Sequence, residues 1–505
     1  MGISGKITLS LVIVLISFWV LVVSYTIGPL LISGSPIMNK NLNISFVTLA
    51  LVGISTILSV EWIGIYITHH FVTNNVINHQ HTCIMNSKNN NDKYNQHLPL
   101  VSIIIPARNE ENVIRKTLLN CLQQTYKNIE VIIICHNSYD RTYQESQIVH
   151  DTRIRIFDFK TSESGKGVAL NYAMDYAKGE YICLLDADGK LEANFIHNTL
   201  PLFDRGYAAV QGKISPSNRH YNHLTELLAL EGDLFSIPFM TVRSFFHKKT
   251  PLGGTGFIIK KDVLIHVGKF SNALIDDFEL SFRLYRKGYR IAFAPLSIVY
   301  DEKPPFFDVM IRQRTRWVKG HIDLLKHKTT ESTDVLGIIY WLYPVFTLCG
   351  LLSTCISSIA IVFYIFFGYY PYSYAYMPVM IWLGSNISIF VLQVLLLKRE
   401  PEIKRFKNVF YAAFLILFSN YWYVVFIKAF FVKSWANTKT IHGFDMPASS
   451  QRSQTVHYNP EDIPVDINNE TTVYGTRRGA IYVPVSVPRS NKVLQRNEDF
   501  NTSSN

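Results

Sequence analysis

Four short apolar runs, each followed by polar residues, constrain the fold of this chain more than any other feature of its sequence. The runs are short and mostly β-branched, and they cover positions 100–106, 129–135, 154–159 and 181–185. Stretches long enough for a helix separate them, and strands that alternate with helices predict an α/β domain with a mainly parallel sheet. Ligands bind such a sheet at the carboxyl ends of its strands. The polar loops expected at that edge are 106–110, 136–140, 164–167 and 186–189.

Two carboxylates stand where the last of these runs ends. Asp186 and Asp188 are one residue apart, so they leave the end of a strand on the same side. Such a pair suits a hard divalent cation, which proteins commonly bind through one or two carboxylates and the phosphates of a substrate. On this motif alone, the alternative is a strand that runs into a simple Asp/Gly turn.

Three other segments carry groups that suit phosphate binding or proton transfer. Lys166 opens a helix, where its ammonium and the helix dipole together can pair with a phosphate. The glycine-rich stretch 251–257 allows a backbone to approach a ligand closely. Asp276 and Asp277 begin another helix, where a buried carboxylate can act as a general base. The alternatives are a solvated lysine, a plain turn, and simple compensation of the helix dipole.

The segment from Phe306 to His327 is basic and amphipathic, as in helices that lie on a membrane surface. Gln313, Arg316 and Trp317 are three and four residues apart, so they share one face of that helix. Taken by itself, the segment is equally compatible with an interfacial helix that has no part in chemistry.

Long apolar segments flank the predicted α/β domain and indicate membrane spans. Of the 505 residues, 48% are hydrophobic and only 17% are charged, whereas average proteins have about 25% charged residues. Each candidate is long enough to cross a bilayer. The candidate spans are 7–32, 44–71, 335–367, 376–397 and 409–432.

The chain is therefore predicted to consist of six segments. They are a transmembrane hairpin (1–72), a polar linker (73–97), the α/β domain (98–303), an amphipathic interface helix (304–330), transmembrane helices (335–432) and a disordered tail (440–505). The tail is rich in Ser, Asn, Thr and Arg, a composition that buries too little apolar surface to fold.

Charge and cysteine usage exclude some classes of partner and site. The formal charge of +11 suits anionic partners, which include nucleotide sugars and anionic lipid headgroups. No compact block of Lys and Arg interleaved with aromatics is present, so we predict no nucleic-acid partner. The six cysteines are scattered and none forms a Cys-x-x-Cys pair, which indicates packed thiols rather than a disulfide framework or a zinc site.

Six motifs, in this order, resemble those of the membrane-embedded family 2 glycosyltransferases, which include cellulose, hyaluronan, chitin and poly-N-acetylglucosamine synthases. They are Pro106-Ala-Arg-Asn109-Glu110, Gly165-Lys166-Gly167, Asp186-Ala-Asp188, Gly253-Gly254-Thr255-Gly256, Asp276-Asp277 and Gln313-Arg314-Thr315-Arg316-Trp317. The last is the most specific, since Gln-x-x-Arg-Trp marks mostly processive synthases in that family. The resemblance covers about residues 98–330. It implies a cytosolic GT-A-type α/β domain, Rossmann-like with a mainly parallel sheet, inserted between N- and C-terminal transmembrane helices.

The resemblance also implies roles for the matching residues. Asp186 and Asp188 would hold Mg²⁺ or Mn²⁺ against the donor diphosphate, and Asp277 would be the general base. The residues implied in donor binding are Pro106, Asn109, Glu110, Asn137, Asp140, Lys166 and Asp186. The residues implied in binding the acceptor and the diphosphate are Gly254, Thr255, Asp276, Gln313, Arg314, Arg316 and Trp317.

The sequence departs from the family pattern in two places. Cys135, His136 and Asn137 stand where many relatives have Asp-Asp-Gly, one aspartate of which binds the nucleobase. Asn137 or Asp140 would then substitute for it. Ile275 and Asp276 stand where the family has Thr or Ser followed by Glu.

The function implied is an inverting, processive transfer of a UDP-linked sugar to a growing β-linked polysaccharide, which the enzyme also moves across the membrane. The partners implied are a nucleotide-sugar donor, a glycan or lipid-linked acceptor and the lipid bilayer, with room for an accessory subunit. The implied location is the plasma membrane, as a multi-pass protein with its catalytic domain in the cytoplasm. Two alternatives stay open: a non-processive membrane transferase that acts on a lipid, and a non-enzymatic sugar-nucleotide sensor or scaffold.

Overall fold

The computed structural model describes residues 42–89, 98–246, 249–326, parts of 359–418, 421–432, 471–475 and 480–484. The chain divides into two compact units, Met1–Ala448 and Ser449–Asn505. The candidate site lies entirely within the first unit.

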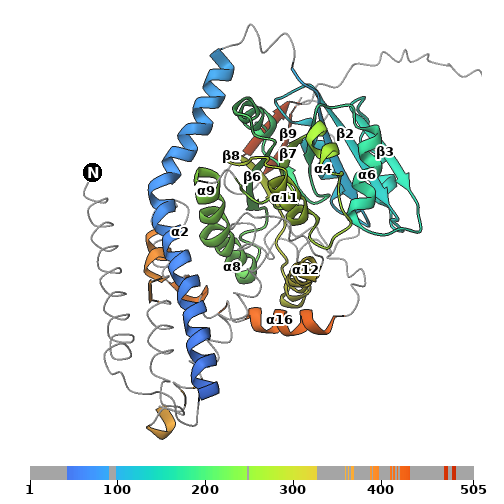
Figure 1. The fold of residues 1–505 in the computed structure, drawn as a ribbon. Coiled ribbons are helices and arrows are strands. Elements are labelled where there is room, and N and C mark those ends of the chain that lie inside the picture. Colours follow the sequence, from blue (N-terminus) through green and yellow to red (C-terminus); the bar gives the residue numbers. More distant parts are fainter. Residues whose placement is uncertain are drawn as a thin grey trace, which may run out of the picture. The chain divides into compact units, whose positions relative to one another are not determined.

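An eight-stranded sheet forms the centre of the first unit (Figure 1), in the order β3-β2-β1-β4-β7-β6-β8-β5. The strands are β1 (Val101–Ala107), β2 (Ile129–His136), β3 (Ile154–Phe159), β4 (Tyr181–Leu184), β5 (Lys190–Leu191), β6 (Ala209–Pro216), β7 (Phe257–Lys260) and β8 (Ile291–Asp301). Strands β1 to β4 pair in parallel, as do β6 and β8, while β7 and β5 pair antiparallel to their neighbours. The prediction of a mainly parallel α/β sheet is confirmed, and an open sheet of this kind fits a GT-A-like fold.

Helices cover both faces of the sheet because its strands are apolar on both sides. In β1, Ile103 and Ile105 pack with α4 (Ile114–Leu122), while Ile104, between them, packs with α6 (Lys166–Tyr176). Side chains of successive strand residues alternate between the faces, so a continuous run such as β1 fills both layers. The sequence pattern of unbroken apolar runs therefore corresponds to strands buried between two helical layers.

The remaining helical elements of the sheet domain frame its strand-end loops. They are α5 (Thr142–Gln147), α7 (Phe195–Thr199), η1 (Leu200–Arg205), α8 (His223–Glu231), the π-helical turn η2 (Gly232–Ser236), α9 (Ile237–Phe246), α10 (Lys261–His266), α11 (Asp276–Arg286) and α12 (Phe307–Lys326). Helix α12 is the predicted amphipathic segment. It packs on α16 (Tyr421–Phe431) through a cluster that includes Met310, Val318 and Val425 (Figure 1).

A long helix, α2 (Leu42–Asn89), runs beside the sheet domain. Buried Gln80 joins the two: its amide donates to Ser297 Oγ at 3.0 Å and to the Asn198 carbonyl at 3.1 Å, and its carbonyl accepts from Leu296 N at 2.8 Å. The helix therefore has a fixed register on the domain.

The stretch 73–97 differs from the predicted polar linker, since it stays helical as far as Asn89. The reason is packing. Val76, Cys83 and Ile84 are buried at helical spacing, a pattern that polar neighbours hide in the sequence.

Three of the five predicted membrane segments lie wholly or largely outside the described residues. Segment 7–32 does so completely, and 335–367 and 376–397 do so for the most part, whereas most of 409–432 is described. Segment 44–71 lies in α2. No described helix combines the length and the apolar character that a membrane crossing requires.

In the second unit, the structure describes two strands within the range 440–505 that was predicted to be disordered. β9 (Thr471–Gly475) and β10 (Ala480–Pro484) pair antiparallel.

Candidate active site

The carboxylate that follows β4 meets the start of α6 and the glycine-rich loop before β7. The Lys166 ammonium donates to Asp186 Oδ1 at 2.6 Å and to the Gly254 carbonyl at 3.0 Å. The Asp186 backbone N–H donates to Thr255 Oγ1 at 3.0 Å. Because β7 pairs antiparallel with β4, the start of β7 and the end of β4 share one edge of the sheet. Four predicted site residues from three separate segments are thus brought together.

The glycine-rich loop also passes close to the start of α11. Gly254 has a φ of +79°, and a Cβ there would lie 3.0 Å from Asp277 Oδ2. Only glycine adopts such a conformation without strain and leaves this space to the carboxylate. In this structure the loop backbone lies close to the predicted general base, and its predicted approach to a ligand stays a prediction.

The charged side chains of this cluster shift one another's pKa values. Burial alone would lower the pKa of the Lys166 ammonium, but the charges of Asp186, Asp276 and Asp277 outweigh it and raise that pKa. Burial and the neighbouring charge of Asp276 raise the pKa of Asp277 to about 7. A carboxylate with a pKa near neutrality is well matched to the work of a general base.

Helix α12 brings an arginine to the same cluster. Gly320 lies against the residue before α11: a Cβ at this glycine would come within 2.8 Å of Ile275 Cγ2. His321, on the next position, contacts Phe278 with ring centroids 4.7 Å apart. Burial raises the pKa of Asp276, and the positive charge of Arg316 opposes that rise. Arg316 therefore lies close enough to act on the acidic start of α11.

Arg314, in contrast, is not brought into this cluster. Its Nη2 donates to Glu231 Oε2 at 2.5 Å, and the negative charges that act on it are those of Glu231 and Asp301. Its guanidinium lies over the ring of Trp317, 4.3 Å from the centroid. The structure thus separates two arginines that the sequence motif grouped: Arg314 pairs with Glu231 of α8, while the charge of Arg316 acts on Asp276. Gln313 and Trp317 are half-buried on α12.

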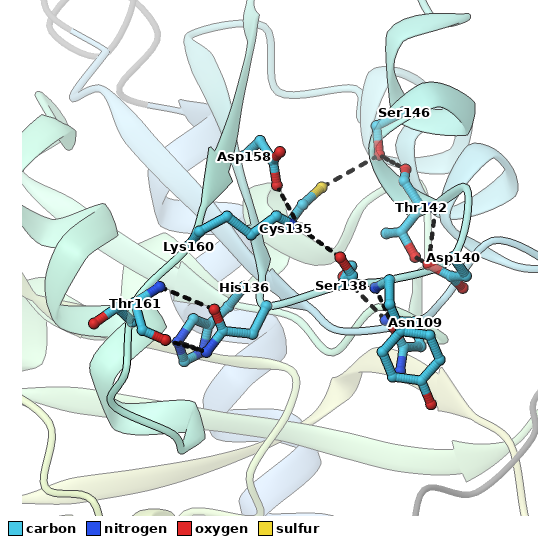
Figure 2. Close-up of polar contacts among 12 residues, drawn as sticks. Asn109, Cys135, His136, Ser138, Asp140, Thr142, Ser146, Asp158, Lys160 and Thr161 are labelled. Atoms are coloured by element: carbon cyan, nitrogen blue, oxygen red, sulfur yellow. Dashed lines mark hydrogen bonds and ion pairs between the residues drawn. The ribbon is translucent and has the colours of Figure 1, made fainter.

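The loop after β2 is held by its own side chains (Figure 2). Asn137, with a φ of +50°, donates from its amide to the carbonyls of Thr161 at 2.9 Å and Glu163 at 3.1 Å, and its carbonyl accepts from Thr161 N at 2.9 Å. An amide engaged in this way braces the loop. These contacts give Asn137 a bracing role in the loop, and its predicted part in base binding stays a prediction.

Asp140 and Asn109 tie the same loop to the one after β1 (Figure 2). Asp140 accepts from Thr142 N at 3.0 Å and from Glu111 N at 3.2 Å. The Asn109 N–H donates to Ser138 Oγ at 3.1 Å, and its side-chain carbonyl accepts from Tyr139 N at 2.9 Å. Glu110 joins the same contact through its N–H, which donates to Thr142 Oγ1 at 2.6 Å, and Pro106 lies within β1 opposite Ile134. Asn109, Glu110 and Asp140 thus join the loops after β1 and β2 to each other.

His136 occupies the position of a missing family aspartate. Its ring is buried and stacks on Phe159 with centroids 5.3 Å apart and an interplanar angle of 24°. Burial, with the charges of Arg108 and Lys160, lowers the pKa of this imidazole. At neutral pH the side chain is uncharged, so it replaces an anionic group by a neutral aromatic one.

Gln211 is a site residue that the sequence pattern did not single out. It is fully buried on β6. Its carbonyl accepts from Gly253 N at 2.8 Å, and its amide donates to the carbonyls of Thr255 at 3.0 Å and Gly256 at 3.1 Å. It fixes the loop whose Gly254 and Thr255 contact Lys166 and Asp186. In the sequence, Gln211 follows the apolar pair Ala209 and Val210 and precedes Gly212 and Lys213, so no apolar pattern marks it.

The carboxylates after β4 have the chemistry that a divalent cation requires, but the protein supplies few ligands. Asp186 and Asp188 are half-buried and present hard oxygen atoms at the strand end. In the part of the chain that the structure covers, no three His, Cys, Asp or Glu side chains gather in a metal-binding group. Such a site fits a cation that takes most of its ligands from substrate phosphates and water.

Comparison with known proteins identifies relatives of this domain. The profile of the family described as "Glycosyltransferase like family 2" matches residues 99–320. The probable glycosyltransferase YdaM of Bacillus subtilis is 29% identical over 357 residues, which are 66% of this chain and 83% of that protein.

Two further relatives are synthases of different products. The beta-monoglucosyldiacylglycerol synthase of Trichormus variabilis is 30% identical over 263 residues, 49% of this chain and 56% of that protein. The poly-beta-1,6-N-acetyl-D-glucosamine synthase of Staphylococcus aureus is 26% identical over 235 residues, 45% of this chain and 55% of that protein. The chain thus spans about half the length of these two relatives.

Among solved structures, the mannosyltransferase PcManGT from Pyrobaculum calidifontis, in complex with GDP-Man and Mn²⁺, superposes with a TM-score of 0.42. The two are 15% identical, and the match covers 64% of this chain and 98% of that one.

Proposed function

We propose that this glycosyltransferase, whose family 2 domain spans residues 99–320, transfers a sugar from a nucleoside-diphosphate donor to a growing β-linked polysaccharide. The nucleotide that we propose for this donor is UDP. The observation that carries the proposal is the meeting of Lys166, Asp186, Asp276 and Asp277 at one edge of the sheet. Such a cluster unites a cation for the diphosphate with a carboxylate for the acceptor. The alternative of a non-enzymatic sensor or scaffold is set aside, because the family domain and its relatives support an enzyme.

Asp277 is the group that takes the acceptor proton. As the acceptor hydroxyl attacks the anomeric carbon of the donor, its proton passes to the Asp277 carboxylate and the bond from that carbon to the diphosphate breaks. The nucleoside diphosphate leaves on the opposite side, so a single displacement inverts the anomeric centre. The pKa of about 7 lets Asp277 accept this proton and release it again near neutral pH.

Positive side chains and the strand-end carboxylates receive the diphosphate. Lys166 stays protonated and already contacts the Gly254 carbonyl at the loop rim. Arg316 is exposed beside the acidic start of α11 and suits bidentate binding of a phosphate. Asp186 and Asp188 would hold Mg²⁺ or Mn²⁺, which when bound supplies charge that stabilises the leaving diphosphate.

The acceptor is proposed to lie against α12. Trp317 offers an indole face on which a sugar ring can stack, with an N–H for a hydrogen bond. The apolar flanking segments and the basic amphipathic helix support a site at the cytoplasmic face of the plasma membrane, beside spans that would carry the polymer across.

A second candidate is a non-processive enzyme that adds one sugar to a membrane lipid. The similarity to a monoglucosyldiacylglycerol synthase favours it, whereas the Gln-x-x-Arg-Trp motif at positions 313–317 favours a processive enzyme. The two candidates share the chemistry of Asp277 and differ in the acceptor.

One experiment tests both candidates. Membranes that contain the full chain are incubated with Mg²⁺ or Mn²⁺ and, one at a time, with labelled UDP-glucose, UDP-N-acetylglucosamine, UDP-galactose and GDP-mannose. The product is then sized. Membranes that contain Asp277→Asn serve as the control. Long labelled polymer supports the first candidate and a singly glycosylated lipid supports the second. Products that match the Asp277→Asn control for every donor contradict the proposed function.

A further inference from the structure

A second cluster of charged and aromatic side chains lies outside the transfer site, where α8, α12 and α16 meet. Glu231 is the last residue of α8. Its Oε2 accepts from Arg314 Nη2 at 2.5 Å and its Oε1 accepts from the Tyr421 hydroxyl at 2.9 Å. The side chains of Arg314 and Glu231 are only 14% and 16% exposed. Both carboxylate oxygens thus have a partner, as a buried ion pair needs if it is to offset its loss of hydration.

The Arg314 guanidinium lies between two indole rings. Its Cζ is 4.3 Å from the Trp317 centroid and 5.6 Å from the Trp422 centroid. A planar cation at this distance from a ring is attracted by the ring's electron-rich face. One face of Trp317 is therefore covered by Arg314, and only the other face can take a ligand.

The surrounding packing fixes this arrangement rather than leaving it to the ion pair alone. Leu228 of α8, Ile311 of α12 and Val425 of α16 are buried in one cluster around it. An ion pair inside such a cluster sets the rotation of α12 about its own axis, because Arg314 and Trp317 are one helical turn apart.

We propose that Glu231 is a positioning residue for the acceptor: it holds Arg314 flat against one face of Trp317 and so keeps the other indole face toward the transfer site. This inference rests on the proposed function, in which that free face stacks on the acceptor sugar. Glu231 acts on the acceptor site through Arg314, while its second oxygen, which accepts from the Tyr421 hydroxyl, joins α8 to α16. Arg314 is then part of the surface that binds the acceptor, while Arg316 binds the diphosphate.

Two variants separate positioning from a purely structural role. Arg314→Lys keeps a charge for Glu231 but removes the planar group that covers the indole. The exchanged pair, Glu231→Arg with Arg314→Glu, restores opposite charges between α8 and α12 but places a carboxylate over Trp317. Asp233→Asn is the matched control, because Asp233 forms a similarly buried pair with Arg219 on the same helical stretch, without contact to Trp317.

The readout is the ratio of transfer to hydrolysis. With the labelled donor that the panel identifies, sugar found in product is divided by sugar released to water, and the donor KM is measured in parallel. We expect both Arg314→Lys and the exchanged pair to lower this ratio at least tenfold, with the donor KM within twofold of the parent. The melting temperature of Arg314→Lys stays near that of the parent, and Asp233→Asn lowers the melting temperature without changing the ratio.

The inference is overturned if Arg314→Lys keeps the parental ratio of transfer to hydrolysis. It is also overturned if the exchanged pair has both the melting temperature and the ratio of the parent. In either case Glu231 serves only to join the helices. Should the exchanged pair not fold, the result for Arg314→Lys decides alone. A parent protein that consumes no donor is a failure of the proposed function itself, and it is seen before any variant is compared.

Discussion

Replacing the buried amide of Gln211 is the sharpest test of how the site is built. Gln211→Leu keeps the approximate volume of the side chain on β6 but removes every polar contact to the loop 253–256. That loop supplies the Gly254 carbonyl to Lys166 and the Thr255 hydroxyl to the backbone of Asp186. The substitution should therefore make the position of loop 253–256 less fixed on the donor side of the site. It removes no group that is proposed to contact the substrate.

The magnitude follows from the contacts. Two amide protons of Gln211 are shared by the carbonyls of Gly212, Thr255 and Gly256, and its carbonyl accepts from Gly253 N. We count three hydrogen bonds, each of which contributes about 1 kcal/mol net, so the free energy of unfolding should fall by about 3 kcal/mol. The donor KM should rise about tenfold, which corresponds to roughly 1.4 kcal/mol of lost contacts at the loop.

The assay combines urea unfolding with donor kinetics on the full chain. Gln124→Leu is the control, because Gln124 is equally buried and joins the chain after α4 to the start of α7. Its amide donates to Glu192 O at 2.8 Å and its carbonyl accepts from Ile196 N at 3.4 Å. The control should lose stability and keep its donor KM. The reasoning fails if Gln211→Leu loses under about 0.5 kcal/mol, a loss too small for even one such bond. It also fails if the two variants change the donor KM alike.

Three further predictions test the groups around this loop. Asp277→Asn should bind donor with unchanged affinity but lose transfer. Because the base must be deprotonated and its pKa is raised to about 7, kcat/KM of the parent should rise through pH 7 to a plateau, and a flat profile from pH 5.5 to 8.5 argues against this base. Asp188→Ala should weaken donor binding with Mn²⁺ but not after EDTA, as calorimetry can measure; equal weakening in both conditions contradicts a metal role. Gly320→Ala places a methyl 2.8 Å from Ile275 Cγ2, so it should cost about 1–3 kcal/mol in thermal unfolding and slow transfer. Ile275→Ala in the same chain should restore both the stability and the rate of transfer. If Gly320→Ala changes neither quantity, α12 does not pack so closely against Ile275.

The strands and their order along the chain follow from the sequence because burial on both faces leaves a visible pattern. β3 has the predicted limits, 154–159. β1 is shifted by one residue at both ends, and β2 and β4 differ from the prediction by one residue at their carboxyl ends. The pattern fails for β8 (Ile291–Asp301) because its second half is only partly buried, so polar and apolar residues mix. Its pairing with β6 also shifts register between Gly212 and Lys213, a tertiary feature that no local run of residues encodes.

The candidate site was predictable to the extent that motifs mark loop ends. Lys166 and Asp186 follow parallel strands, whose carboxyl ends lie at one edge of the sheet. Thr255 reaches that edge because β7 pairs antiparallel with β4, and Asp277 approaches the same loop at Gly254. Spacing within a helix could not assign different roles to Arg314 and Arg316. The two arginines are two residues apart and so lie on different faces of α12, but only the packing of α8 and α16 decides what each face contacts.

The charges in the site link the binding of the donor to the ionisation of Asp277. When Asp276 and Asp277 are ionised, they and Asp186 make three carboxylates that face two cations, Lys166 and Arg316, so the cluster then has an excess of negative charge. A diphosphate adds more, and in a half-buried site that repulsion is not screened as it would be in water. The donor should therefore bind poorly unless further positive charge enters with it. Burial and the charge of Asp276 keep the pKa of Asp277 high in the free protein, and positive charge that accompanies the donor would lower it. Binding of the donor and readiness of the base are thus linked through charge, without any movement of the backbone.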